Sequence, residues 1–160
     1  MTTARAATLQ ETLRLKKLPT NGLGWHHELR RGLPYRSLLS VAKALKLSEK
    51  DMLKAMDISP RVAAARKKAK RLNCAESDLL YAIARAYVRL ASFKPLQEAT
   101  QWLVSKTEVL KGEIPLEMLH TRLGTEYVSS VIDRDRALLA SKIKDNEPEE
   151  QAEEDNEDQT

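Results

Sequence analysis

A run of basic side chains between Arg61 and Arg71 is the part of the sequence that points most clearly to chemistry. It follows Ser59 and Pro60, a residue pair typical of the start of a helix. First-turn side chains of a helix can reach base edges in the DNA major groove, where arginine makes two hydrogen bonds to guanine. The side chains predicted to face bases are Arg61, Val62, Ala65 and Arg66. Those predicted to contact phosphates, which set affinity without reading sequence, are Lys67, Lys68, Lys70 and Arg71.

The same run of charges also fits a solvated helix end, because many protein surfaces carry comparable clusters. The two interpretations differ in salt dependence. Neutralisation of about six phosphates predicts that log K falls with log salt at a slope near −5, whereas a merely solvated helix predicts no such binding.

No other residues have the spacing of a catalytic or metal site. His26 and His27 are adjacent, so a helix directs them apart, and His120 has no ligand partner at metal-site spacing. The five glycines form no phosphate-binding loop. Cys74 is the single cysteine and is predicted to be a half-buried thiol rather than a reactive one. We therefore expect no metal, no cofactor and no enzymatic activity.

Three short helices are predicted to position the basic run. Apolar residues recur at helical spacing in Tyr35–Lys46, with Leu38, Leu39, Ala42 and Leu45 on one face. Ser48 followed by Asp51 predicts the start of a second helix, which ends near Met56, and Pro60–Arg71 is the third. Short helices joined by short turns, with a cationic third helix, predict a helix-turn-helix.

The remaining chain also has helical patterns, and no stretch alternates as a strand does. The fold class predicted is therefore all-α. A long helix over about residues 75–92 is predicted to form the centre of the core, and further helices are predicted after Pro95, Pro115 and Gly124. Leu96 begins the apolar stripe of the helix after Pro95. Leu138 and Leu139 extend the apolar stripe of the helix after Gly124. The predicted organisation is an N-terminal extension on a hinge (1–33), a helix-turn-helix domain (34–93), a helical C-terminal domain (94–144) and a disordered acidic tail (145–160).

The charge distribution divides the chain in two. The formal net charge is +4, but the last 16 residues contain nine Asp or Glu and no Lys or Arg. The preceding residues carry 27 basic and 14 acidic side chains. Such a basic body favours a polyanionic partner, usually nucleic acid, although dispersed positive charge also serves solubility. No apolar run has the length of a membrane span, and one cysteine permits no internal disulfide, so we expect a cytoplasmic protein.

Two stretches resemble the Xre/MbcA/ParS-type antitoxins. Residues 32–93, beginning GLPYRSLLSVAKAL, resemble their helix-turn-helix portion, and residues 99–134, beginning ATQWLVSK, resemble their toxin-binding portion. The positions that match the second motif are Trp102, Leu103, Gly112, Pro115, Leu116, Leu119, Thr121 and Gly124. The resemblance implies a cognate toxin, most often of the RES type, which destroys NAD. It also implies that the antitoxin represses its own promoter.

Most of those matched positions are expected to be core, turn or cap residues, which leaves the solvent side of the last helix for toxin contact. The residues predicted to bind the toxin are Tyr127, Arg134, Arg136, Lys142 and Lys144. Here the chain departs from the family, which commonly ends with a short Arg-Ile and Gly. The acidic tail has three interpretations: it plugs the toxin's active site, it shields the basic DNA-binding face, or it is simply solvated.

Two functions remain open from the sequence. The first is an antitoxin that neutralises a toxin and represses its own operon, as a homodimer on an inverted repeat. The alternative is a stand-alone dimeric helix-turn-helix regulator with no toxin partner.

Overall fold

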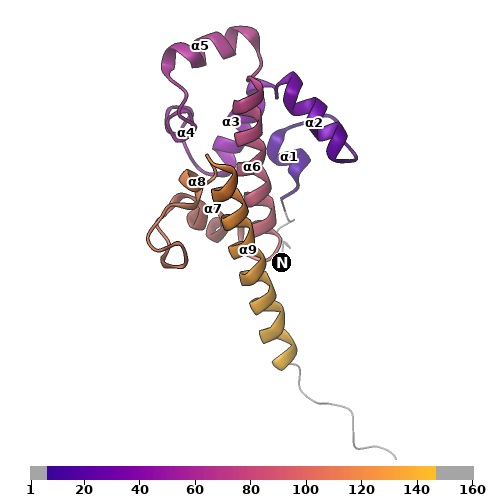
Figure 1. Cartoon of the computed structure of the whole chain (residues 1–160), viewed down its shortest axis with the longest axis vertical. Helices are drawn as coiled ribbons and strands as arrows, with labels where there is room; N and C mark the ends of the chain where they lie inside the picture. Colours follow the sequence, from indigo (N-terminus) through magenta and orange to yellow (C-terminus); the bar gives the residue numbers. More distant parts are fainter. Residues whose placement is uncertain (1–6, 147–160) are drawn as a thin grey trace, which may run out of the picture.

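The computed structural model describes residues 7–146 as a bundle of helices (Figure 1). Within that range it contains no β-strand, only one isolated bridge between Pro34 and Arg71, which confirms the predicted all-α class. The α-helices are α1 (Leu9–Leu13), α2 (Gly22–Arg31), α3 (Tyr35–Ala44), α4 (Glu49–Ala55), α5 (Pro60–Ala69), α6 (Cys74–Ala91), α7 (Leu96–Val104), α8 (Pro115–Met118) and α9 (Arg122–Asp145). A 3-10 turn, Glu108–Leu110, lies between α7 and α8.

Helix α6 is the spine of the molecule, as the sequence predicted. It packs against α1, α2, α3, α7 and α9, and Figure 1 shows it running through the centre of the bundle. Leu80, Ile83 and Leu90 are completely buried along it, and Tyr87 is buried beside them. Burial of one such aliphatic side chain contributes roughly 1.5–3 kcal/mol, so α6 holds the N-terminal and C-terminal helices in one hydrophobic core.

The predicted helix starts are confirmed by capping hydrogen bonds. The Ser48 hydroxyl accepts a hydrogen bond from the Asp51 N–H, and the Ser59 hydroxyl accepts one from the Val62 N–H. The Thr121 hydroxyl caps α9 in the same way, by accepting from Gly124. Each cap satisfies an N–H group that has no partner inside its helix.

The N-terminal segment packs on the bundle and is not a separate helix on a hinge. Helices α1 and α2 both lie against α6, and α1 also lies against α3. Leu13 is completely buried, and its carbonyl accepts a 2.6 Å hydrogen bond from the Ser37 hydroxyl of α3. The Trp25 ring of α2 lies 4.6 Å from the Tyr81 ring of α6, centroid to centroid. Residues 7–31 therefore belong to the same core as the helix-turn-helix.

The segment before α3 is tied to the segment after α5. The Tyr35 N–H donates to the Lys70 carbonyl, and the Leu72 N–H donates to the Leu33 carbonyl. Gly32 begins this segment at a φ of 93°, in the left-handed region that favours glycine, and lies against the Leu72 carbonyl. The two ends of the helix-turn-helix therefore meet at Gly32.

Four leucines of the predicted apolar stripes are exposed. Leu39, Leu96, Leu138 and Leu139 are exposed by 40, 39, 55 and 39%, although the sequence assigned them to apolar stripes. Leu138 and Leu139 belong to the part of α9 after Asp135, in which all described residues are exposed. Figure 1 shows this end of α9 extending beyond the body of the molecule. Cys74 is exposed at the start of α6, not half-buried.

The predicted acidic tail falls, from residue 147 onward, outside the described residues. None of the helices within residues 7–146 combines the length and apolar character needed to cross a membrane.

Candidate nucleic-acid interface

Helix α5 forms one end of the molecule, between α4 and α6 (Figure 1). Only Ala63 of this helix is buried, and Val62 is half-buried against the core, so both anchor α5 to the body. The opposite side of the helix carries the exposed residues Arg61, Ala65 and Lys68. Because Ser59 caps the helix and Pro60 opens it, Arg61 and Val62 lie in its first turn. This is the turn that reaches base edges when such a helix enters a major groove.

Three of the predicted DNA-binding cations are available for an external anion. Arg61, Lys68 and Lys70 are exposed, and the part of the chain that the structure describes offers none of them an acidic partner. Lys70 ends α5 in a left-handed conformation, with a φ of 59°. An exposed cation with no internal partner is available to a phosphate.

Arg66 has an internal partner instead. Its Nε lies 2.7 Å from Oε2 of Glu76, and the same carboxylate oxygen accepts the Asn73 N–H at the start of α6. The hydrogen bond with Glu76 raises the pKa of Arg66. Arg66 therefore joins α5 to α6, and a base contact by its guanidinium requires this ion pair to open.

Lys67 also has an internal partner, in a network with Glu49 and Tyr35. The Glu49 carboxylate lies 2.6 Å from the Lys67 ammonium and accepts a 2.7 Å hydrogen bond from the Tyr35 hydroxyl. The hydrogen bond from Lys67, supported by the one from Tyr35, lowers the pKa of Glu49. Burial, together with the nearby Glu49 carboxylate, raises the pKa of Tyr35. The network joins α3, α4 and α5, and so sets the orientation of α5.

Arg71 is the third predicted DNA contact with an internal role. Its Nη1 donates a 2.6 Å hydrogen bond to the Gly32 carbonyl, next to the Pro34 bridge. Sequence reasoning missed the acceptors, Glu49, Glu76 and Gly32, because each is brought to its cation by tertiary packing.

The Glu49 network predicts an acid-sensitive contribution to stability. The pKa of Glu49 is lower in the folded protein than its ordinary value of 4.5, so the stabilisation is present above that value and is lost as the pH falls through the folded pKa. We expect Glu49→Gln to make thermal unfolding less dependent on pH in this acidic range. Unfolding curves of both proteins across the range measure this, with Asp51→Asn as a control outside the network. Equal pH dependence in wild type and Glu49→Gln would contradict the prediction.

The residues predicted to bind a toxin all lie on α9 but not on one face. Tyr127 and Arg134 are seven residues apart, nearly two turns, and share a face, whereas Arg134 and Arg136 point in nearly opposite directions. All five, including Lys142 and Lys144, are exposed. The set is therefore distributed around the helix.

The second half of α9 continues the apolar stripe that the sequence predicted for the last helix. Val128, Val131 and Ile132 are buried against the body, and Lys94 pairs with Asp135 at 3.3 Å near the end of this contact. Beyond Asp135, all described residues are exposed. The same helix face then continues with Leu138, Leu139 and Ile143, which are 55, 39 and 57% exposed. This face has no partner within residues 7–146, so it is a candidate interaction surface.

The arrangement of α4, the four-residue turn 56–59 and α5, with cations on the outer side of α5, is that of a helix-turn-helix DNA-binding protein. Residues 24–85 match the family model of the antitoxin Xre-like helix-turn-helix domain. The match supports the predicted resemblance to Xre-type antitoxins for this part of the chain, and with it a role in DNA binding and transcription regulation. No curated protein matches the chain. The matched range begins inside α2 and ends inside α6, so it includes the whole of α3, α4 and α5.

Residues 7–146 contain no cluster of His, Cys, Asp and Glu that is suited to hold a metal ion. His120 instead contacts the helix-turn-helix, with its Nε2 2.6 Å from the Ala55 carbonyl oxygen at the end of α4. The loop before α9 therefore touches the last turn of α4.

Proposed function

We propose that this protein is the antitoxin of a toxin-antitoxin pair, a cytoplasmic, non-enzymatic protein that represses its own operon and neutralises a partner toxin of the RES type. The match of residues 24–85 to the antitoxin Xre-like domain carries this proposal. The exposed cations of α5 support its DNA-binding half, and the exposed apolar face of α9 supports its toxin-binding half.

In the DNA complex, α5 enters the major groove. Arg61 and Ala65 face base edges, while Lys68 and Lys70 contact phosphates. Arg66, Lys67 and Arg71 act mainly by fixing the orientation of α5, because their internal partners hold this helix at its angle to the body. Two copies bind an inverted repeat as a homodimer, since one short recognition helix reads few base pairs.

In the toxin complex, the apolar residues at the end of α9 insert into the toxin, and the surrounding cations Arg134, Arg136, Lys142 and Lys144 contact its rim. Tyr127 extends the contact toward the body on the Arg134 face. Apolar anchors surrounded by charge are the usual anatomy of a protein interface.

The test of this function is co-expression. We expect the product of the adjacent open reading frame to arrest growth when induced alone, and the arrest to be relieved, with a stable complex recovered, when this chain is present. Normal growth without this chain, and no complex, would contradict the toxin half and leave the stand-alone regulator.

The exposed end of α9 gives a sharper prediction. We expect Leu138→Asp with Ile143→Asp to weaken toxin binding by about 30-fold or more, because two apolar anchors are replaced by charges that must lose their hydration. Titration calorimetry with the purified toxin measures this. The matched control is Val109→Asp with Leu23→Asp, which adds the same two charges at exposed apolar residues of the 3-10 turn and of α2. Equal affinity in both variants would exclude this face from the interface.

A further inference from the structure

A basic groove runs along the outer side of α3, from the end of α5 to the segment between α1 and α2. Near α5 it is lined by Arg36, Leu39, Glu49, Lys67 and Lys70. It continues past Leu39, which lines both parts, to the segment between α1 and α2. There the charged lining residues are Glu11, Arg14, Lys16 and Lys43. We call the whole depression the α3 groove.

The α3 groove is strongly cationic. Its described lining residues include six Lys or Arg and two Glu, and Glu49 pairs with Lys67. Within residues 7–146, no acidic side chain pairs with Arg14, Lys16 or Lys43. Cations gathered in a concave surface attract a polyanion more strongly than the same charges dispersed on a convex one.

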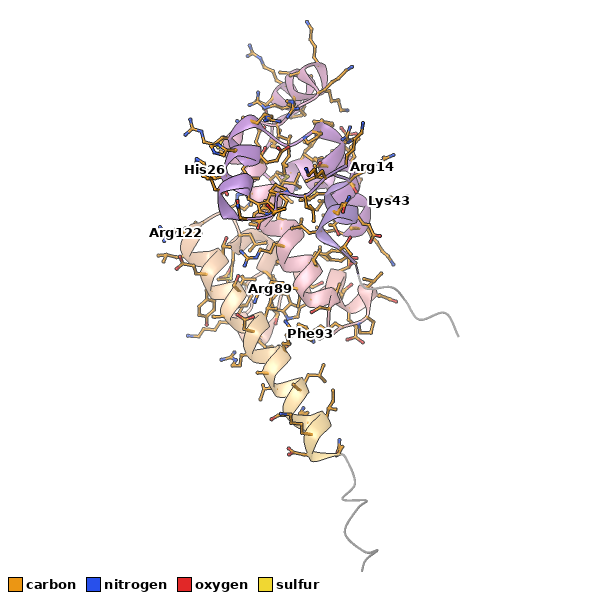
Figure 2. The ribbon with its side chains drawn as sticks, turned by 90° about the vertical axis from the view of Figure 1, so that its right-hand side faces the viewer. Arg14, His26, Lys43, Arg89, Phe93 and Arg122 are labelled. Carbon is orange, nitrogen blue, oxygen red and sulfur yellow. The ribbon has the colours of Figure 1, made fainter. Side chains whose placement is uncertain are left out.

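The backbone positions of these cations are fixed by packing. Arg14 ends α1 in a left-handed conformation, and its carbonyl accepts a hydrogen bond from Arg36 Nε at 3.4 Å. The neighbouring Leu13 carbonyl is held by Ser37 of α3. Figure 2 shows Arg14 and Lys43 close together on one side of the molecule, on the facing elements α1 and α3. The groove is therefore a preformed feature, in which two segments far apart in sequence present charge together.

We propose that the α3 groove binds the phosphate backbone of the DNA held by α5 and extends the footprint to one side of the recognition helix. The proposal rests on the DNA-binding half of the proposed function. It is carried by continuity, because Lys67 and Lys70 at the end of α5 line the same groove as Arg36. Arg14 and Lys16 lie outside the range 24–85, so the family match does not account for them.

The chemistry favours nucleic acid over an acidic peptide as the ligand. The cations are spread along the groove from Lys70 to Lys16, as a row of phosphates requires. Among the described residues that line it, Leu39 is the only exposed large apolar side chain. Peptide grooves usually supply several apolar anchors, whereas contacts to phosphate need only charge and hydrogen-bond donors.

The experiment compares two double variants of the full chain that lose the same net charge. The test variant is Arg14→Gln with Lys43→Gln. The control is Lys106→Gln with Lys111→Gln, two exposed lysines in the segment between α7 and α8, on the other side of α6 from α1 (Figure 1). The probe is a short DNA duplex of arbitrary sequence, because phosphate contacts do not depend on sequence. Fluorescence anisotropy gives the dissociation constant over a range of salt concentrations, and thermal unfolding checks that each variant is folded.

Each lost phosphate contact reduces the slope of log K against log salt by roughly 0.9, so we expect the test variant to have a slope shallower by roughly 1 to 2 and the control to match wild type. Equal slopes in the two variants would overturn the proposal while leaving the role of α5 intact. If wild type binds no duplex, including the DNA upstream of its own gene, the DNA-binding function itself fails. Weaker binding of an acidic peptide by the test variant, with an unchanged slope for DNA, would overturn the proposal in favour of a protein ligand.

Discussion

Gly32→Ala is expected to destabilise the protein by roughly 3 kcal/mol or more. Gly32 has a φ of 93°, which L-residues rarely adopt, and a Cβ placed on it would lie 2.1 Å from the Leu72 carbonyl oxygen. The obstructing atom belongs to the backbone, so no side-chain rotation relieves the contact. The backbone must separate there, at the junction that also holds the Arg71 hydrogen bond.

Denaturant unfolding measures this effect, and the chain provides a matched control. Gly22 begins α2 and has nothing within 4 Å of an added Cβ, so Gly22→Ala should leave stability unchanged or raise it by up to about 1 kcal/mol. A loss of less than about 1 kcal/mol in Gly32→Ala would show that the segment shifts without cost, contrary to the tight junction described above.

Arg61→Ala is expected to weaken specific DNA binding by roughly 5- to 150-fold, which corresponds to about 1–3 kcal/mol. Arg61 is the exposed first-turn arginine of α5, and it has no acidic partner among the described residues. Removing the Arg61 side chain loses a bidentate pair of hydrogen bonds to guanine and leaves the hydrophobic core unchanged. Affinity for the DNA upstream of the gene should therefore fall much more than affinity for duplex of arbitrary sequence.

Two further arginines serve as comparisons for Arg61. Arg122→Ala, at a side chain 90% exposed on α9, should leave DNA affinity unchanged. Arg66→Ala should lower thermal stability, because it breaks the ion pair with Glu76 at the start of α6. Equal loss of specific and non-specific affinity in Arg61→Ala would show that Arg61 contacts a phosphate instead of a base.

The helix-turn-helix was predictable because its signals are local. Ser48, Ser59 and Pro60 mark helix starts through contacts within a few residues, and the structure confirms each start. The exposed cations of α5 were predictable for the same reason. The partners of Arg66, Lys67 and Arg71 were not, because Glu76, Glu49 and Gly32 come into reach only after separate helices pack.

Burial was harder to predict than helix position. Leu38 and Leu39 are adjacent, and helical spacing alone did not separate the buried Leu38 from the exposed Leu39. Leu138 and Leu139 continue the face of Val131 and Ile132 without any change in pattern. They are exposed because the body of the molecule ends near the ion pair of Lys94 and Asp135. The apolar pattern of a single helix gives no information about where the neighbouring helices end.

The unsupported end of α9 has a thermodynamic consequence for any partner that binds it. A helical segment of about ten residues without tertiary contacts is marginally stable in water, so residues 137–145 depend on their connection to the packed half of α9 for their helical form. When a partner binds this segment, part of the binding free energy is offset by the conformational entropy lost in ordering the segment as a helix. The affinity of this partner is therefore coupled to the intrinsic helix propensity of the segment, so that residues such as Ala140, whether or not they touch the partner, help to set how tightly the complex holds.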